Sequence, residues 1–280
     1  MTPTYLPILK AKIGEFEAIS HLKRQVSKKT LPLFEVSRLG EKMRSAARYK
    51  GSDAVTCAYL DEIAQNIAAV WEGRSALVDA FQWPAESKTE TGEHILPYLY
   101  TRLRSLGVDI VPVVGYDRWE SKQYKLAIQG VETGKDNYYC LRLDSHAIED
   151  SAEPEFFEER VLEILNDLSI EPARCGILID FGDIFSASLE DVVEQANGIV
   201  QMLGRKGFKF FVTAGCSLPT SIDKAVNERN STGKVIRKEM LLWRTMRSEY
   251  PKLNWMFGVQ RRRHPVPGAA GDHPVRSGAN

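Results

Sequence analysis

Short apolar runs alternate along the chain with longer segments in which apolar residues recur every three or four positions. Runs of four to eight apolar residues indicate buried strands, and the longer period indicates amphipathic helices. The repeated order of strand and helix is typical of βα units and a parallel sheet. We predict eight strands, near residues 5–10, 31–36, 75–80, 109–115, 138–144, 176–181, 208–214 and 254–258.

The segments between these strands predict helices. In the first, residues 14–26, the spacing places Phe16, Ile19, Leu22 and Val26 on one face. Gly107 and Gly207 each follow a predicted helix and precede a strand, and Ser188 begins an S-x-x-D capping pattern. The other helices are predicted over residues 58–71, 92–107, 121–131, 154–168, 188–207 and 235–251.

The number of strands favours a (β/α)8 TIM-barrel-like fold. Eight parallel strands close such a barrel, and a chain of 280 residues is close to the usual size of about 250. An open doubly wound sheet would show the same alternation, so the prediction rests on strand count and chain length. We expect one α/β barrel domain over residues 1–258. Residues 259–280 are rich in Arg, Pro, Gly, Ala and His without helical period, so we expect the last helix to be missing or replaced by a disordered tail.

Charge and composition narrow the function classes. Lys plus Arg and Asp plus Glu both number 37, so we expect no overall attraction to nucleic acid or to anionic lipid. The chain has no stretch of about 18 apolar residues and no signal-peptide pattern at its start, which predicts a soluble, cytoplasmic protein without a membrane partner. The cysteines are far apart and form no CxxC pair, so we expect buried thiols rather than zinc ligands or disulfides.

Six of the predicted strands end in a charged or polar side chain. In a barrel these six would gather at the carboxyl end of the strands, where barrel enzymes carry their chemistry. Side chains alternate along a strand, so all of these residues except Tyr116, which lies just beyond its strand, share the inward direction of the residue two positions before them. The six residues are Lys10, Glu35, Asp79, Tyr116, Arg142 and Asp180.

These residues allow two interpretations, and the sequence leaves both open. In the first they form a functional site, in which Lys10 and Arg142 bind a small anionic or phosphate-bearing ligand. Glu35, Asp79 and Asp180 are then the candidate catalytic acids, bases or metal ligands. In the second they form a ring of salt bridges that plugs the barrel, for example Lys10 with Glu35 and Arg142 with Asp180.

Further candidates for ligand binding lie close to the strand ends. Lys12 follows Lys10 by two positions, and Tyr116 could form an aromatic wall together with Trp83. Ser217 lies in the loop after the seventh strand, a position that often binds phosphate in barrels. The sequence contains no HExxH, GxSxG, protein-kinase or GxGxxG motif, and it identifies neither a metal nor a cofactor. Cys216 has no histidine evidently placed to activate it as a nucleophile.

Several short motifs together resemble the beta protein family. The opening strand ends in Lys-x-Lys-x-Gly-Glu and the next carries Pro-Leu-Phe-Glu; LRLD, ILIDFGDI, FVTAGCSLP and IRKEMLLW follow later. The resemblance covers about residues 5–258. It implies a barrel-like fold, often in mobile or phage-defence gene contexts, and it supplies no established reaction. Through the IRKEMLLW motif it adds Arg237 to the candidate ligand-binding residues, together with Glu239 and Trp243.

Two functional hypotheses follow. The first is an enzyme acting on a small anionic or phosphate-bearing substrate at the carboxyl end of the barrel. The second is a non-catalytic recognition or regulatory component in phage defence, with a protein partner encoded nearby. Fold alone does not choose between them.

Overall fold

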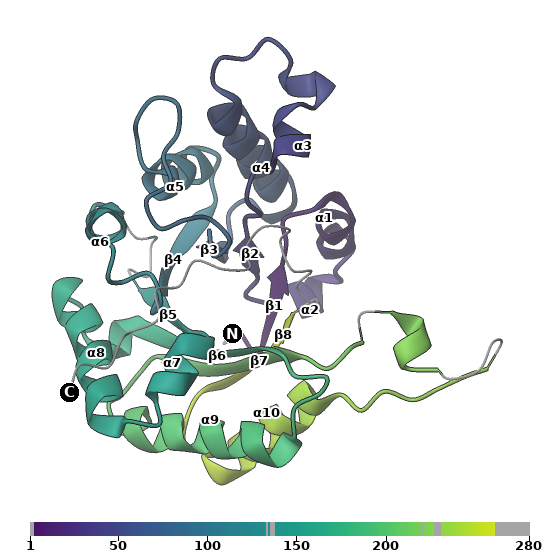
Figure 1. Cartoon of the computed structure of the whole chain (residues 1–280), viewed down its shortest axis with the longest axis vertical. Helices are drawn as coiled ribbons and strands as arrows, with labels where there is room; N and C mark the ends of the chain where they lie inside the picture. The colour runs from purple at the N-terminus through teal and green to yellow at the C-terminus, as the bar shows by residue number, and fades with distance from the viewer. Residues whose placement is uncertain (1–2, 133, 135–137, 220, 227–230, 261–280) are drawn as a thin grey trace, which may run out of the picture.

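Eight parallel strands close into a barrel in chain order in the computed structural model, which describes residues 3–132, 134, 138–219, 221–226 and 231–260 (Figure 1). The barrel closes where β1 pairs with β8, from Tyr5 opposite Phe257 to Ile8 opposite Gln260. The predicted barrel and all eight predicted strands are confirmed. The strands are β1 (Tyr5–Leu9), β2 (Leu33–Glu35), β3 (Ser75–Asp79), β4 (Asp109–Gly115), β5 (Tyr139–Leu143), β6 (Cys175–Asp183), β7 (Phe210–Cys216) and β8 (Trp255–Gln260).

Helices surround the barrel. Most of the predicted helices are present within a few residues of their expected ends, whereas the short helices α3 and α7 were not predicted. Ser188 caps α9 as expected, and Gly107 and Gly207 adopt positive φ angles of 80° and 83°. The helices are α1 (Ile13–Ser20), α2 (Arg24–Ser27), α3 (Glu41–Arg44), α4 (Val55–Trp71), α5 (Ile95–Ser105), α6 (Lys122–Gln129), α7 (Ser145–Asp150), α8 (Pro154–Asp167), α9 (Leu189–Leu203) and α10 (Lys238–Glu249), with 3-10 turns at Ala47–Tyr49, Pro172–Arg174 and Ile222–Lys224.

Alternation along the strands separates two apolar cores. One face of each strand packs inside the barrel, and the opposite face packs against the helices. Inward side chains include Ile8, Leu33, Leu77, Cys140 and Leu178. Each of them lies two positions before a charged residue, so the predicted shared direction is confirmed and the charged side chains stack above this inner core.

The first predicted helix, residues 14–26, is instead two helices. α1 ends at Ser20, and Lys23 takes an extended backbone (φ −58°, ψ 141°) before the single turn of α2. The break lets the chain return to the amino end of the barrel, where the Lys29 carbonyl accepts a hydrogen bond from the Tyr5 amide. The predicted apolar face is therefore not continuous: Phe16 is buried, whereas Val26 is 44% exposed.

The last strand is longer than predicted. Val259 and Gln260, which we assigned to the tail, continue β8 because they pair with Pro7 and Ile8 of β1. The expectation of a disordered tail concerns residues 261–280 and lies outside the described residues.

All four cysteines are buried thiols outside any disulfide, as predicted. Burial raises the pKa of the Cys175 thiol to about 12 and holds that of Cys140 well above its usual value. Among the helices that the structure describes, none is long and apolar enough to cross a membrane.

Candidate functional site

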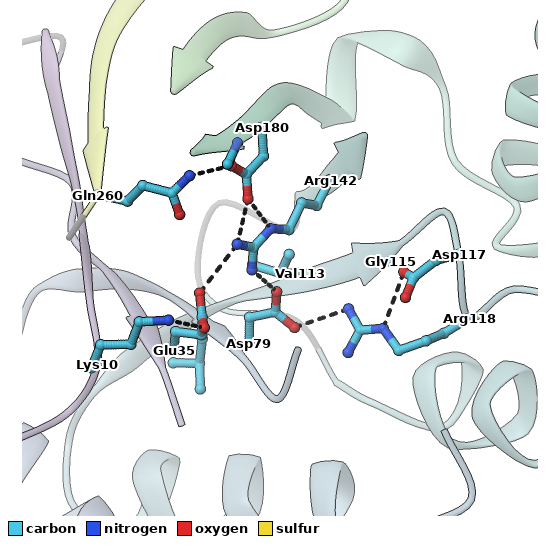
Figure 2. A network of polar contacts seen from close by, with 12 residues as sticks. Lys10, Glu35, Asp79, Val113, Gly115, Asp117, Arg118, Arg142, Asp180 and Gln260 are labelled. Carbon is cyan, nitrogen blue, oxygen red and sulfur yellow. Dashed lines mark hydrogen bonds and ion pairs between the residues drawn. The ribbon is translucent and has the colours of Figure 1, made fainter. Parts of the chain in front are cut away.

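Five of the predicted side chains meet at the carboxyl end of the barrel (Figure 2). Lys10 follows β1, Glu35 and Asp79 end β2 and β3, Arg142 belongs to β5 and Asp180 to β6. None of these residues is more than 6% exposed. We call these five residues the mouth network.

Arg142 is the centre of the mouth network. Its Nη1 donates to Asp79 Oδ2 at 2.6 Å, and its Nη2 donates to Glu35 Oε2 at 3.1 Å. Nε and Nη2 both donate to Asp180 Oδ2, at 2.9 and 2.5 Å. Lys10 Nζ donates to Glu35 Oε1 at 2.6 Å. The pairs Lys10 with Glu35 and Arg142 with Asp180, which the salt-bridge interpretation predicted, are both present.

A further cation, Arg118, extends the mouth network from the loop after β4. Its Nη2 donates to Asp79 Oδ1 at 3.0 Å, and the whole residue is only 6% exposed. The guanidinium lies directly on the backbone of Gly115, where an added Cβ would stand 2.3 Å from Nε and Nη2. A glycine at this position of β4 is therefore what allows the close approach of Arg118.

The last residue of β8 completes the hydrogen bonding of the Asp180 carboxylate. Gln260 Nε2 donates to Asp180 Oδ1 at 2.6 Å, and the Gly182 amide donates to the same oxygen at 3.0 Å. With these bonds, both oxygens of Asp180, Glu35 and Asp79 accept hydrogen bonds. The carboxylate acceptors of the mouth network are thus all engaged.

The donors of Arg118 are not all engaged. Its Nε and Nη1 are buried and have no hydrogen-bond partner among the described residues. Nε lies 3.4 Å from Asp117 Oδ1, an ion pair whose geometry does not make a hydrogen bond. Gln260 Oε1 is also buried without a partner in the described part of the chain. Because an unmet buried N–H costs free energy, Arg118 is the group in this network that most needs an acceptor.

Opposite charges balance within this region. Lys10, Arg118 and Arg142 face the three carboxylates. Burial acts to lower the pKa of Arg142, but Asp180, Glu35 and Asp79 outweigh it and hold that pKa well above its usual value. Burial also acts against the charge on Arg118, and there the negative charge of Asp79 prevails and raises the pKa. Both guanidinium groups are therefore fixed cations.

Asp117 lies beside Arg118 and is less enclosed than the carboxylates of the mouth network. Burial raises the pKa of Asp117, and neighbouring Asp144 and Asp79 raise it further, while Arg118 opposes the shift. Its side chain is 22% exposed, whereas those of Glu35 and Asp79 are fully buried. The surroundings therefore favour the neutral form of Asp117.

Phe81 covers the two guanidinium groups. The Arg142 guanidinium lies 4.2 Å from the centroid of its ring, and that of Arg118 lies 5.8 Å away. The Tyr124 ring packs against Arg118 at 4.9 Å. Aromatic faces attract cations and exclude water, so these rings strengthen the ionic contacts beneath them.

Three further predicted residues, Lys12, Tyr116 and Trp83, lie outside the mouth network. Lys12 is exposed at the start of α1. Tyr116 points toward the helices: its hydroxyl donates to Asp150 Oδ2 at 2.9 Å, and its ring packs on Phe157. The direction follows from alternation, because Tyr116 shares the outward side of Val114. Trp83, the other predicted wall, is buried and donates from Nε1 to the Val36 carbonyl at 3.2 Å.

Ser217 and Arg237 form a second cluster around Glu239. Both donate to the Glu239 carboxylate, Ser217 through its hydroxyl and Arg237 through Nε. Glu239 is 1% exposed and lies in the first turn of α10, where the helix dipole favours a negative charge. This cluster connects the loop after β7 to α10, and within the described part of the chain none of its hydrogen bonds reaches the mouth network.

The three carboxylates converge on a guanidinium group. Among the described residues, no group of three or more His, Cys, Asp or Glu side chains is arranged to hold a metal ion. Glu35, Asp79 and Asp180 instead surround the Arg142 guanidinium.

Arg118, Asp117 and Gln260 were not predicted from the sequence. The first two lie within three residues of the end of β4, which is itself a signal in a barrel. Gln260 could have been found by extending the inward alternation of Met256 along β8.

The chain belongs to the Beta protein family, whose model matches residues 5–275. The match confirms the resemblance and extends beyond the end of β8. No curated protein matches the chain. Among solved structures it is similar to a GH18 chitinase from Pseudoalteromonas aurantia, with 14% identity, a TM-score of 0.46, and coverage of 74% of this chain and 77% of that chain. The catalytic core of xylanase A aligns with 8% identity and a TM-score of 0.33, covering 92% of this chain and 86% of that chain.

Proposed function

We propose that the protein binds a small anionic, phosphate-bearing ligand at the carboxyl end of the barrel, with Arg118 as the main contact. The observation that carries this proposal is the imbalance between acceptors and donors. All the carboxylate oxygens of the mouth network accept hydrogen bonds, whereas Nε and Nη1 of buried Arg118 have no partner among the described residues. The oxygens of an anion supply the missing acceptors, and hydrogen bonds between ions are the strongest of this kind.

Arg142 and Lys10 have a supporting role in this proposal. Their charges are already offset by Glu35, Asp79 and Asp180, so they make the region neutral and rigid rather than attract a ligand themselves. Lys12 is placed to add a solvated positive charge from the start of α1. Ser217 and Arg237 engage Glu239, and we assign them to the second cluster rather than to the ligand.

The test is a calorimetric titration of the intact protein with inorganic phosphate and with a phosphate monoester. We expect binding to the native protein and at least a tenfold weaker affinity for Arg118→Gln, about 1.4 kcal/mol or more. Asp79 keeps Arg142 as a partner in this variant, which protects the fold. Arg102→Gln is the matched control, because Arg102 forms a half-exposed ion pair with Asp61 away from the barrel mouth. Equal binding by native protein and Arg118→Gln would disprove the proposal.

One observation favours recognition without turnover. A general acid or base must exchange a proton with its ligand, and each of the three candidate acids instead accepts hydrogen bonds from buried cations. A ligand on Arg118 would then be held and recognised, as in a component of a phage-defence system. Phosphate release from the bound monoester distinguishes the two functions. Release by the native protein that Glu35→Gln abolishes, while circular dichroism shows the variant still folded, supports an enzyme. An unchanged bound ligand supports recognition.

A further inference from the structure

The unmet hydrogen-bonding groups around Arg118 include an acceptor as well as donors. Nε and Nη1 of Arg118 are buried without an acceptor among the described residues, and Asp117 Oδ1 is buried there without a donor. The Arg118 Nε and Asp117 Oδ1 atoms are 3.4 Å apart, so the unmet donors and the unmet acceptor lie side by side. A ligand that satisfies all of these atoms has to donate a hydrogen bond as well as accept them.

The Arg118 guanidinium is shared between two acids that differ in access. Figure 2 shows Asp79 and Asp117 on different sides of this guanidinium, with Nη2 directed to Asp79 and Nε to Asp117. Both oxygens of Asp79 already accept hydrogen bonds, from Arg118 and from Arg142. The Asp117 side chain is 22% exposed, whereas that of Asp79 is fully buried. Asp117 is therefore the acid beside Arg118 that a ligand from solvent can reach.

The surroundings of Asp117 make a proton welcome at its carboxylate. The charged or titratable groups that face it are Arg118, Asp144, Asp79, Arg142 and His146. Burial raises the pKa of Asp117, the two other carboxylates raise it further, and the arginines oppose them. A ligand that brings a proton to this oxygen therefore meets a more favourable environment than one that brings only negative charge.

We propose that the ligand at Arg118 carries a protonated oxygen, so that the site selects hydrogen phosphate or the monoanion of a phosphate monoester over a fully ionised anion such as sulfate. This inference rests on the proposed function and narrows its ligand class. Oxygens of the anion accept hydrogen bonds from Nε and Nη1 of Arg118, while the P–O–H group donates to Asp117 Oδ1. Sulfate resembles phosphate in shape but carries no proton near neutral pH, so its oxygens face Asp117 Oδ1 with no donor between them.

Burial of these atoms should make the selection strong. An acceptor that a protonated ligand satisfies is left unmet when the ligand lacks the donor, and an unmet buried group costs free energy. With sulfate, repulsion between the ionised carboxylate and the anion adds to this loss. At pH 7 we expect sulfate to bind at least about a hundredfold more weakly than inorganic phosphate.

The test is calorimetric titration of the full chain with inorganic phosphate and with sulfate, at pH 7 and constant ionic strength. Asp117→Asn keeps an acceptor oxygen for the P–O–H group and removes the charge that repels sulfate. We expect this variant to bind sulfate at least about tenfold more tightly and to gain less for phosphate, so that its preference for phosphate falls. Arg118→Gln should weaken the binding of both anions.

Asp61→Asn is the matched control, because Asp61 also pairs with an arginine, Arg102, and lies away from the barrel mouth. It should change neither affinity. Equal binding of phosphate and sulfate by the native protein overturns this inference and leaves the proposed function standing. A preference for phosphate that Asp117→Asn does not reduce also overturns it. Failure of both anions to bind contradicts the proposed function itself, and this inference with it.

Discussion

Each carboxylate of the mouth network, on Glu35, Asp79 and Asp180, is buried together with a cation. This pairing bears on whether the three acids hold the arginines in place or transfer protons. Separating a buried carboxylate from its cation leaves an uncompensated charge in a medium of low dielectric constant. The three acids therefore fix the positions of Arg142 and Arg118 more than they stand ready for proton transfer. Because the carboxylates are enclosed in this way, replacing them should lower the stability of the fold.

We predict that Glu35→Gln and Asp180→Asn lower the free energy of unfolding by about 3–5 kcal/mol, because each leaves a buried cation without its full complement of negative charge. The measurement is urea unfolding followed by circular dichroism. Asp61→Asn is the control, since Asp61 forms a half-exposed pair with Arg102 that should contribute at most about 1 kcal/mol. If both variants lost no more stability than the control, the acids would not stabilise the fold. They would instead form a preorganised site whose charges serve function.

The raised pKa of Asp117 leads to a prediction about pH. Because the folded chain disfavours the ionised form relative to the unfolded chain, the ionised carboxylate lowers stability, and this loss grows as pH rises through the folded-state pKa. Asp117→Asn should therefore raise the melting temperature at pH 7, with a smaller difference at pH 4.

The same substitution should affect the proposed ligand. Protonation of Asp117 removes a negative charge beside Arg118, so phosphate affinity should increase as pH falls through the Asp117 pKa. In Asp117→Asn the affinity at pH 7 should be higher and this contribution to the pH dependence absent. Calorimetry at the two pH values checks both statements, and a variant that binds phosphate more weakly at pH 7 would contradict them.

At the scale of elements, alternation along the strands was the reliable signal. It correctly placed Arg142 above Cys140 and Asp180 above Leu178, because inward direction depends only on counting by two. It also explains why Tyr116 points outward: the residue follows Gly115, the end of β4, and so shares the outward side of Val114. The break between α1 and α2 was not predictable in this way, since no Gly or Pro occurs in residues 15–26 and the cause is the return of the chain toward β2.

We predict that Gly115→Ala abolishes phosphate binding although Arg118 is still present. The Gly115 backbone is not in the positive-φ region, so alanine is allowed there, but its Cβ would lie 2.3 Å from Arg118 Nε and would displace the guanidinium from Asp79. Calorimetry should show a loss comparable to that of Arg118→Gln. Gly198→Ala in α9 is the control, because nothing lies within 4 Å of its added Cβ, and alanine there should be neutral or stabilising by up to about 1 kcal/mol. Unchanged binding in Gly115→Ala would show that Arg118 does not need this backbone position.

At the scale of the whole molecule, the alternation of strand and helix predicts the barrel. The positions at which the strands end predict the five residues of the mouth network. The contribution of Arg118 could not be deduced, because it depends on the close approach of its side chain to Gly115, which is a tertiary contact. The stacking of Tyr5 on Phe257 arises in the same way. These two residues are 252 positions apart and become neighbours only when β8 pairs with β1.

Closure of the barrel by β8 gives the final prediction, which compares two shortened chains. A chain ending at Gln260 should keep the stability of the full chain, because residues 261–280 contain no large apolar side chain to bury. A chain ending at Gly258 should be less stable by at least about 1.5–3 kcal/mol. It loses the hydrogen bond from Gln260 to the Asp180 carboxylate and the pairing of Val259 and Gln260 with β1.

Urea unfolding of the three chains measures this difference, and Gln260→Ala in the full chain separates the side-chain hydrogen bond from the strand pairing. If the bond carries the effect, Gln260→Ala should reproduce most of the loss, because Asp180 Oδ1 then keeps only the Gly182 amide. A chain ending at Gly258 that is as stable as the full chain would mean that β8 closes the barrel without its last two residues. A large loss of stability already in the chain ending at Gln260 would mean that residues 261–280 pack on the barrel.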